Sequence, residues 1–152
     1  MPHINELIDY CVDVFIVHKN KVLLRKHEKY DMWLSVGGHI ELNETPQQAA
    51  IREVKEEVGL NVRLFGEKEN ESSSKDYEEL IAPVFMNIHK INDKHRHLSL
   101  IYFASSDSDK VVEENEKSKG YKWFTLKELN ENKEGIKPEI LKYAKTALQK
   151  LG

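Results

Sequence analysis

Residues 38–60 read GHIELNETPQQAAIREVKEEVGL, and this stretch predicts a helix preceded by a tight connection. Thr45 supplies an N-cap hydroxyl, Pro46 suits the first helical position, and Gln48 completes a capping-box pattern with Thr45. Gly59 offers the left-handed residue that commonly ends a helix. We therefore expect a helix that begins at Pro46 and ends just before Gly59.

This helix should pack through one apolar side and carry an acidic patch beside it. At about 100° per residue, the apolar side chains gather on one side, at Ala50, Ile51, Val54 and Val58. Spacings of three and four residues bring Glu53, Glu56 and Glu57 together in the adjoining sector. A hard divalent cation such as Mg²⁺ would offset the repulsion among these carboxylates, because it binds carboxylate oxygens. A solvated acidic helix face is the alternative.

Two glycines precede the helix. Gly37 and Gly38 let backbone approach backbone, or a ligand, without an intervening Cβ, and we expect them to form a loop. The backbone groups of this loop would lie close to a metal ion and to phosphates. Arg52 would pair with Glu44 or Glu56 and hold the loop against the helix; an exposed surface cation is the alternative for Arg52.

The same 23 residues match the whole sequence motif of the Nudix family. The motif is Gly, five residues, Glu, seven residues, Arg-Glu, an aliphatic residue, any residue, Glu-Glu, any residue, Gly and an aliphatic residue. The chain therefore resembles Nudix pyrophosphohydrolases. The resemblance implies an α/β fold, a Nudix-type α/β/α sandwich with a mixed central sheet, as a single domain over residues 1–152. One departure is Val36, where the family commonly has proline before the two glycines.

The resemblance also implies roles for individual residues. It assigns metal binding to the carbonyl of Gly38 and to Glu53, Glu56 and Glu57. It makes Glu53 the base within the motif, with Arg52 and Glu44 supporting the geometry. The implied reaction is hydrolysis of a diphosphate bond with Mg²⁺, or with Mn²⁺ in its place. Water attacks phosphorus in this reaction, and the metal neutralises charge that develops on the phosphate oxygens.

Family members often recruit one more acid from outside the motif. Glu116, in the polar segment before Trp123, is our candidate for this metal ligand. Glu113 and Glu114 compete with it, and a solvated loop acid is an equal alternative for each of the three.

Four residues are candidates for substrate contact. Arg25, at the end of the second predicted strand, resembles in position a residue that contacts substrate in the nucleoside-triphosphate branch of the family. Gly37 and His39 flank Gly38 and are candidates for contact with a phosphate; a surface histidine is the alternative for His39. Tyr77 lies 17 residues past Leu60, a spacing that the family associates with dinucleoside polyphosphates.

The implied substrate is a nucleoside diphosphate linked to another group, with a (modified) nucleoside triphosphate as the first choice. Dinucleoside polyphosphates, ADP-ribose and nucleotide sugars are alternatives. A Nudix-fold nucleotide-binding module without catalysis is a hypothesis of another class, but such domains typically lose acids of the motif. Isopentenyl diphosphate isomerase, of related fold, would need a catalytic cysteine, whereas Cys11 stands in an apolar run that favours a small buried side chain.

The rest of the chain predicts further strands and helices. Strand-like segments span residues 11–17, 21–25, 60–65, 84–91, 97–104 and 121–124. The fifth of these is apolar on both faces and should be central. A helical turn should span 125–129, and a C-terminal helix should begin at Pro138. His95 and His97 share a face of one strand; with no cysteine or acid at matching spacing, we favour core or substrate-pocket roles over a metal pair.

Composition limits the class of protein. The chain has 152 residues, 39% of them apolar, which suits one domain. It carries 23 basic and 26 acidic residues, so it lacks the basic excess that favours polymeric nucleic acid. No stretch approaches the roughly 20 apolar residues of a membrane span, and the N-terminus lacks a signal-peptide pattern. We expect a cytoplasmic monomer or homodimer whose partner is a small nucleotide.

Overall fold

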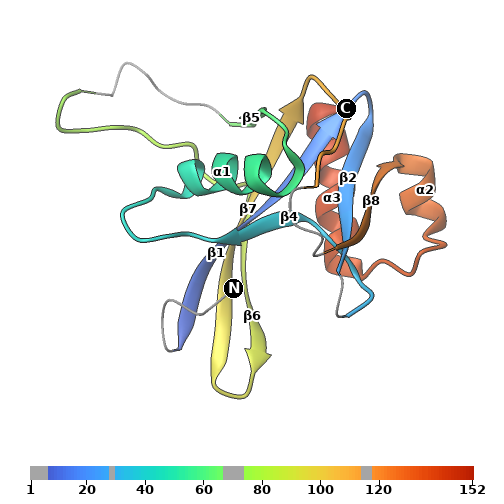
Figure 1. Cartoon of the computed structure of the whole chain (residues 1–152), viewed down its shortest axis with the longest axis horizontal. Coiled ribbons are helices and arrows are strands. Elements are labelled where there is room, and N and C mark those ends of the chain that lie inside the picture. Colours follow the sequence, from blue (N-terminus) through green and yellow to red (C-terminus); the bar gives the residue numbers. More distant parts are fainter. Residues whose placement is uncertain (1–6, 28–29, 67–73, 114–117) are drawn as a thin grey trace.

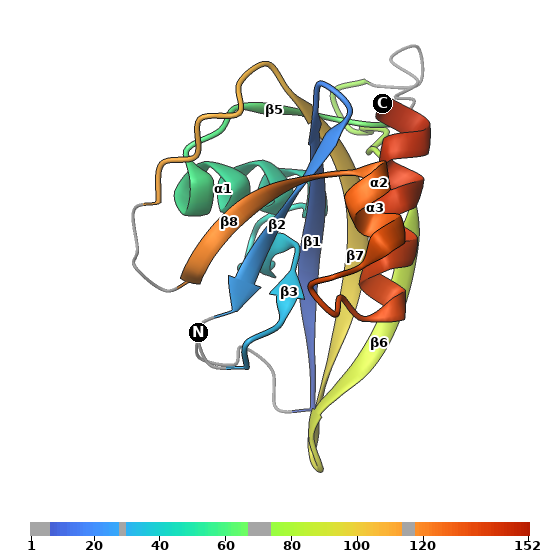
Figure 2. The same cartoon turned by 90° about the vertical axis from the view of Figure 1, so that its right-hand side faces the viewer.

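The molecule has three layers, with a mixed sheet between helices on its two faces (Figures 1 and 2). The computed structural model describes residues 7–27, 30–66, 74–113 and 118–152. Helix α1 (Pro46–Val58) packs on one face of the sheet, and α3 (Pro138–Leu151) packs on the other beside the short α2 (Leu126–Glu131). The expected α/β/α sandwich is confirmed. No helix within the described ranges is long and apolar enough to cross a bilayer.

The sheet is mixed because two of its long strands run parallel. In chain order the strands are β1 (Ile8–His18), β2 (Lys21–His27), β3 (Trp33–Leu34), β4 (Val36–His39), β5 (Val62–Leu64), β6 (Phe85–Asn92), β7 (His95–Ser106) and β8 (Ser118–Thr125). The main path runs β3-β2-β1-β7-β5, while β4 pairs with β1, β6 with β7 and β8 with β2. Strands β1 and β7 are parallel, and the other pairs are antiparallel. As predicted, β7 is central.

Alternation along β1 divides the core into two halves. Val12, Val14 and Ile16 pack in the half beneath α1. Phe15 and Val17 point the other way and pack in the half that includes α3. Since successive residues of a strand face opposite sides of a sheet, the register of β1 decides which polar residues share a face further along the strand.

The N-terminal cap of α1 has the predicted form, but the packing side of the helix does not. Thr45 Oγ1 accepts from the Gln48 N–H at 3.3 Å, and Gln48 Oε1 accepts from the Thr45 N–H at 2.9 Å. Ile51, predicted to pack, is 45% exposed, whereas Glu53 is only 3% exposed. The buried side of α1 is thus rotated toward Glu53, because that side faces strand β4, where Gly38 leaves room for the Glu53 carboxyl group.

The two glycines lie within β4, so the prediction that they form a loop was wrong. Gly37 is opposite Asp13 and Gly38 is opposite Val12 in the antiparallel pairing of β4 with β1. A Cβ on Gly37 would overlap the Val12 carbonyl oxygen, and one on Gly38 would lie 2.5–2.7 Å from the carboxyl atoms of Glu53. Neither glycine has a positive φ. Both are therefore required for close approach, as the sequence indicated, and not for a special backbone conformation.

Gly37→Ala should destabilise the fold, because the added Cβ meets backbone that cannot rotate away. We expect the free energy of unfolding to fall by about 1–3 kcal/mol, measured by urea denaturation. Lys21→Ala, at an exposed position of β2, is the control and should change stability by less than about 0.5 kcal/mol. Equal stability of the two variants would show that β4 can shift away from β1 at little cost.

Candidate active site

Arg52 joins helix α1 to the segment that precedes it. Its Nε donates to Glu44 Oε2 at 2.6 Å and its Nη2 donates to Glu44 Oε1 at 3.0 Å, which is a two-point guanidinium–carboxylate pair. Nη2 also donates to the carbonyl oxygen of His39 at 3.0 Å. These bonds tie the end of β4 to the helix and show the pairing of Arg52 with Glu44 that the sequence predicts.

The same guanidinium orients two glutamates of the acidic patch. Nη1 of Arg52 donates to Glu53 Oε1 at 3.0 Å and to Glu56 Oε2 at 3.1 Å. Glu53 is held between this contact and the backbone of Gly38, whereas the side chain of Glu56 is 57% exposed. The patch therefore has an inner part, formed by the buried carboxylates of Glu53 and Glu57, and an outer part, formed by Glu56.

The inner carboxylates have raised pKa values. Burial raises the pKa of Glu53 against the opposing effect of Arg52. Burial also raises the pKa of Glu57 to about 7, with Arg25 opposing the shift and Glu53 adding to it. Among the described residues, Oε2 of Glu57 is buried without a hydrogen-bond partner. A divalent cation fits this donor set, since it would bind oxygens that the protein leaves unsatisfied.

Arg25 lies close enough to the acidic patch to affect it. Its charge lowers the pKa of Glu57 and that of Asp13. Arg25 sits on β2 opposite Leu34, and its buried Nε has no hydrogen-bond partner in the part of the chain that the structure describes. A buried guanidinium nitrogen with an open bonding position suits an anionic substrate group.

Asp13 is a residue that the sequence analysis missed. It stands opposite Gly37 on β1; burial raises the pKa of its carboxyl, while hydrogen bonds with the side chains of Ser99 and Ser35 oppose the shift. The signal was present in the sequence, because an acid in the strand CVDVFIV cannot be buried without polar partners. Asp13 interacts electrostatically with Arg25 and Glu57, while strand alternation places its side chain on the Phe15 face of β1, away from α1.

The side chain of His39 lies on the sheet face opposite the one that Gly38 turns toward α1. Its imidazole is buried, lies 3.2 Å from Asp9 Oδ2 through Nε2, and stacks edge-on against His97 with ring centroids 5.0 Å apart. Strand alternation explains the difference, since Gly38 faces α1 and the next residue must face the other side of the sheet. Contact of the His39 side chain with a phosphate stays a prediction.

The candidate acids outside the motif are only partly described. Val112 donates its N–H to the Val58 carbonyl at 2.9 Å, so the segment that carries Glu113 lies at the C-terminal end of α1. Glu114 and Glu116 fall outside the described residues. Of the three candidates, Glu113 is the one that the structure places near the helix of the acidic patch.

Tyr77 is placed on the surface before β6. Its side chain is 56% exposed, and its hydroxyl donates to Glu79 Oε2 at 2.6 Å. The segment following it is tied to α1, since the Ile81 N–H donates to Gln47 Oε1 at 2.9 Å. Its contact with a substrate stays a prediction.

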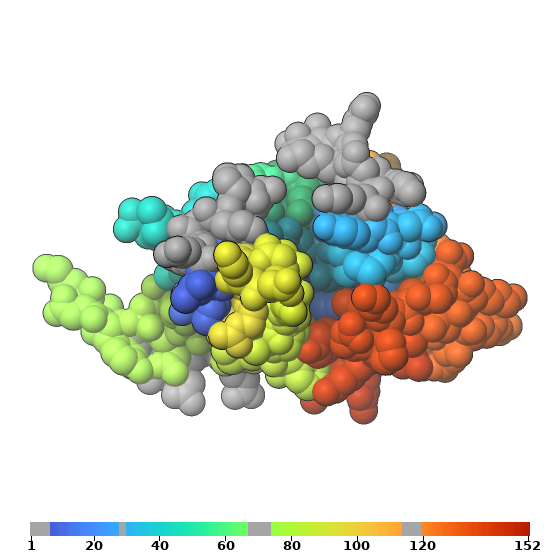
Figure 3. All heavy atoms as spheres, turned by 90° about the horizontal axis from the view of Figure 1, so that it is seen from below, coloured from blue at the N-terminus to red at the C-terminus, as the bar shows by residue number. Residues whose placement is uncertain are grey.

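The surface is hollowed on the side away from β5. In Figure 3 a recess lies between the yellow end of the β6–β7 hairpin, the light-blue β2–β3 region and the orange-red C-terminal helices. Blue atoms of β1 are visible at its floor.

Comparison with known proteins agrees with this geometry. A model of the NUDIX domain matches residues 9–144. The chain belongs to the Nudix family. It is thus an enzyme of the Nudix hydrolases, which act on pyrophosphate bonds and generally use a divalent metal ion.

A solved Nudix structure resembles this hydrolase over nearly its whole length. A NUDIX-family hydrolase from Clostridium perfringens superposes with a TM-score of 0.87 at 39% identity, covering 95% of this chain and 98% of that one. The MutT protein from Methanosarcina mazei Go1 superposes with a TM-score of 0.68 at 15% identity, covering 96% of each chain. The second likeness shows the fold alone.

Curated relatives match over a shorter region. An NAD-capped RNA hydrolase, NudC, from Vibrio atlanticus is 39% identical over 61 residues, which is 37% of this chain and 23% of that protein. A dihydroneopterin triphosphate diphosphatase from Escherichia coli is 48% identical over 44 residues, which is 29% of each. An RNA pyrophosphohydrolase from Hydrogenovibrio crunogenus is 46% identical over 59 residues, which is 36% of each. The chain thus covers about a third or less of their lengths.

Arg52→Lys should weaken the fold although it keeps the charge. A lysine ammonium cannot reproduce the two-point pair with Glu44 together with the bonds to Glu53 and Glu56, so Glu53 would stay buried without its partner. We expect the free energy of unfolding to fall by about 1–3 kcal/mol in metal-free protein. Arg63→Lys, whose side chain is 79% exposed beside Asp107, is the matched control and should be neutral. Equal losses in the two variants would contradict a special role for the Arg52 network.

Proposed function

We propose that this Nudix hydrolase cleaves the diphosphate bond of a nucleoside diphosphate linked to another group, with a (modified) nucleoside triphosphate as the favoured substrate and Mg²⁺ as the cofactor. The observation that carries the proposal is the pair of inner carboxylates, Glu53 and Glu57. Both have raised pKa values, and one Glu57 oxygen is buried without a partner among the described residues. Burying such groups is costly unless a cation and a substrate complete the site.

Three side chains have assigned parts in the proposed reaction. Glu53 accepts the proton of the attacking water, and burial raises the pKa of its carboxyl group, which makes the carboxylate a stronger base. Arg52 keeps Glu53 in position through the 3.0 Å bond. Arg25 binds a phosphate oxygen through its open Nε. Glu53, Glu56, Glu57 and the Gly38 carbonyl would hold Mg²⁺, which would supply charge neutralisation for the phosphate oxygens. Mn²⁺ can replace it.

The names of the curated relatives define the panel of substrates to test. One relative is named for dihydroneopterin triphosphate, and two are named for RNA. Dinucleoside polyphosphates, ADP-ribose and nucleotide sugars complete the panel. Phosphate and pyrophosphate release should be measured with Mg²⁺ and with excess EDTA. We expect turnover of a nucleoside triphosphate with Mg²⁺, and we expect EDTA to abolish this turnover.

Other outcomes of the panel separate the alternatives. Turnover of dinucleoside polyphosphates alone would favour that branch and would direct attention to Tyr77. Turnover of RNA 5′ ends alone would contradict the expectation that this acidic chain avoids polymeric nucleic acid. Nucleotide binding without turnover of any compound would favour a non-catalytic binding module.

Glu53→Gln should lower kcat about 10²–10⁴-fold, because the amide cannot accept the proton of the attacking water. The change is nearly isosteric, so the circular dichroism spectrum should stay that of the parent protein. Glu139→Gln, in the exposed first turn of α3, is the matched control and should leave kcat unchanged. Near-parental turnover in Glu53→Gln would sink the assignment of the base.

Arg25→Gln should lower kcat/KM about 10–100-fold, mainly through a higher KM, since a charge-assisted bond to phosphate contributes about 1.5–3 kcal/mol. Arg63→Gln removes a comparable positive charge at an exposed site and is the control. An unchanged KM in Arg25→Gln would place the phosphates elsewhere.

A further inference from the structure

A second group of potential metal ligands lies on the sheet face opposite α1. It contains a cysteine, an aspartate and three histidines from three strands, here named the histidine cluster: Asp9, Cys11, His39, His95 and His97. None of these residues is among the glutamates of the Nudix motif. The cluster combines sulfur, nitrogen and oxygen donors, which is a different chemistry from the oxygen donors beside α1.

Strand register creates this cluster. Cys11 is directly opposite His39 in the antiparallel pair of β1 and β4. Asp9 is directly opposite His97 in the parallel pair of β1 and β7. Near His95 and His97 in the sequence there is no cysteine or acid at matching spacing, which favours core or pocket roles, but strand pairing places Asp9 and Cys11 beside them. The missing donors come from β1, more than 80 residues earlier in the chain.

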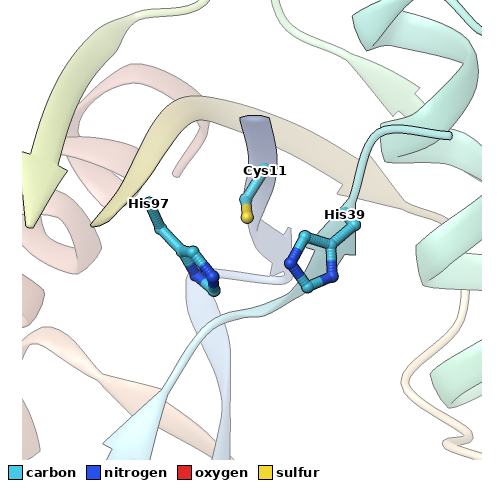
Figure 4. Close-up of side chains that lie close together, drawn as sticks. All are labelled: Cys11, His39 and His97. Carbon is cyan, nitrogen blue, oxygen red and sulfur yellow. The ribbon is translucent and has the colours of Figure 1, made fainter. Parts of the chain in front are cut away.

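The donor atoms are close enough to share one ion. The ligand atoms of Cys11, His39 and His97 all lie within 4.8 Å of one another. Figure 4 shows these three side chains converging from three different strands. Ligands of a tetrahedral zinc ion are about 3.3–3.8 Å apart, given zinc–ligand bonds of about 2.0–2.3 Å. Small side-chain rotations would bring these donors to that spacing.

Burial and the neighbouring acid add a second reason to infer a site. Cys11 is 6% exposed and His39 is 5% exposed. Asp9, itself 1% exposed, places Oδ2 at 3.2 Å from Nε2 of His39 and at 3.3 Å from Nε2 of His95. A carboxylate that holds one ring nitrogen of a histidine orients the ring and fixes the tautomer, as is typical around metal-binding histidines.

We propose that Cys11, His39 and His97 bind a divalent ion of the zinc class, with Asp9 as the residue that orients His39. Thiolate and imidazole donors select such borderline-soft ions, while Mg²⁺ prefers oxygen ligands. On binding, the Sγ–metal bond replaces the S–H bond of Cys11 and the thiol proton passes to solvent. No electron is transferred.

Cobalt(II) is the probe that tests the proposal, because the chain has a single cysteine. A thiolate-to-cobalt charge-transfer band in the near ultraviolet can then come only from Cys11. The metal-free full chain should be titrated with Co²⁺ in the presence of excess Mg²⁺, which saturates oxygen-only sites. We expect the band to saturate at one equivalent and to disappear when Zn²⁺ is added. A titration without the band would overturn the proposal.

Variants identify the ligands. Cys11→Ser should remove the band, and His97→Gln should weaken Co²⁺ binding at least tenfold. Asp9→Asn should weaken it about 10–100-fold while leaving the shape of the band unchanged, as expected for an orienting residue. His18→Gln is the matched control on β1, since His18 bonds to the carbonyl of Ser106 instead, and it should bind as the parent does. Parental affinity in His97→Gln would overturn the assignment even if Cys11→Ser failed to fold.

The test is independent of the proposed hydrolysis. Glu53→Gln should keep the cobalt band while losing turnover, because Glu53 lies on the other side of β4. If both signals were lost together in a folded Glu53→Gln variant, the two groups of ligands would not form separate sites, and the proposal would fail.

Discussion

The close approach of α1 to β4 at Gly38 is the contact on which the rest of the site depends. A side chain at this position would occupy the space of the Glu53 carboxyl group. With hydrogen alone at Gly38, the helix settles against the strand, and Glu53 is buried beside backbone instead of facing water. The rotation of the helix that buries Glu53 also exposes Ile51. One missing Cβ thus sets the orientation of the helix that carries the acidic patch.

Burial of two neighbouring carboxylates needs compensation. Arg52 provides part of it, because one guanidinium bonds to Glu44, Glu53 and Glu56 and also to a strand carbonyl. The charge of Arg25 lowers the pKa of Glu57 and so stabilises its carboxylate form. The negative charge of the glutamates that these two arginines do not offset is the reason that a divalent cation fits here. Because Arg52 already holds Glu53 and Glu56 in place, a cation bound there would cost little side-chain entropy.

Features that depend on neighbours in the sequence could be predicted, and features that depend on strand register could not. The caps at Thr45 and Gly59 and the pairing of Arg52 with Glu44 involve residues a few positions apart. A helical wheel places Ile51 on the packing side because it uses only the residues of the helix, whereas Gly38 of β4 decides that Glu53 is buried instead. The pattern of two adjacent glycines predicts a loop, but the same pattern occurs in a strand that packs closely. The family motif provided the acidic patch, but Asp13 belongs to no motif.

The histidine cluster is the clearest example of a feature that depends on strand register and could not be predicted from the sequence. A one-residue slip between β1 and β7 would turn Asp9 and Cys11 to the α1 face and separate them from the histidines. Strand β4 then acts as the divider between two chemistries, since Gly38 faces the glutamates and His39 faces the cysteine. Hard oxygen donors on one side and sulfur and nitrogen donors on the other prefer different ions, so a zinc-class ion in the cluster need not displace Mg²⁺ from the carboxylates. Alternation along this four-residue strand is enough to place the two sets of potential ligands on opposite faces of the sheet.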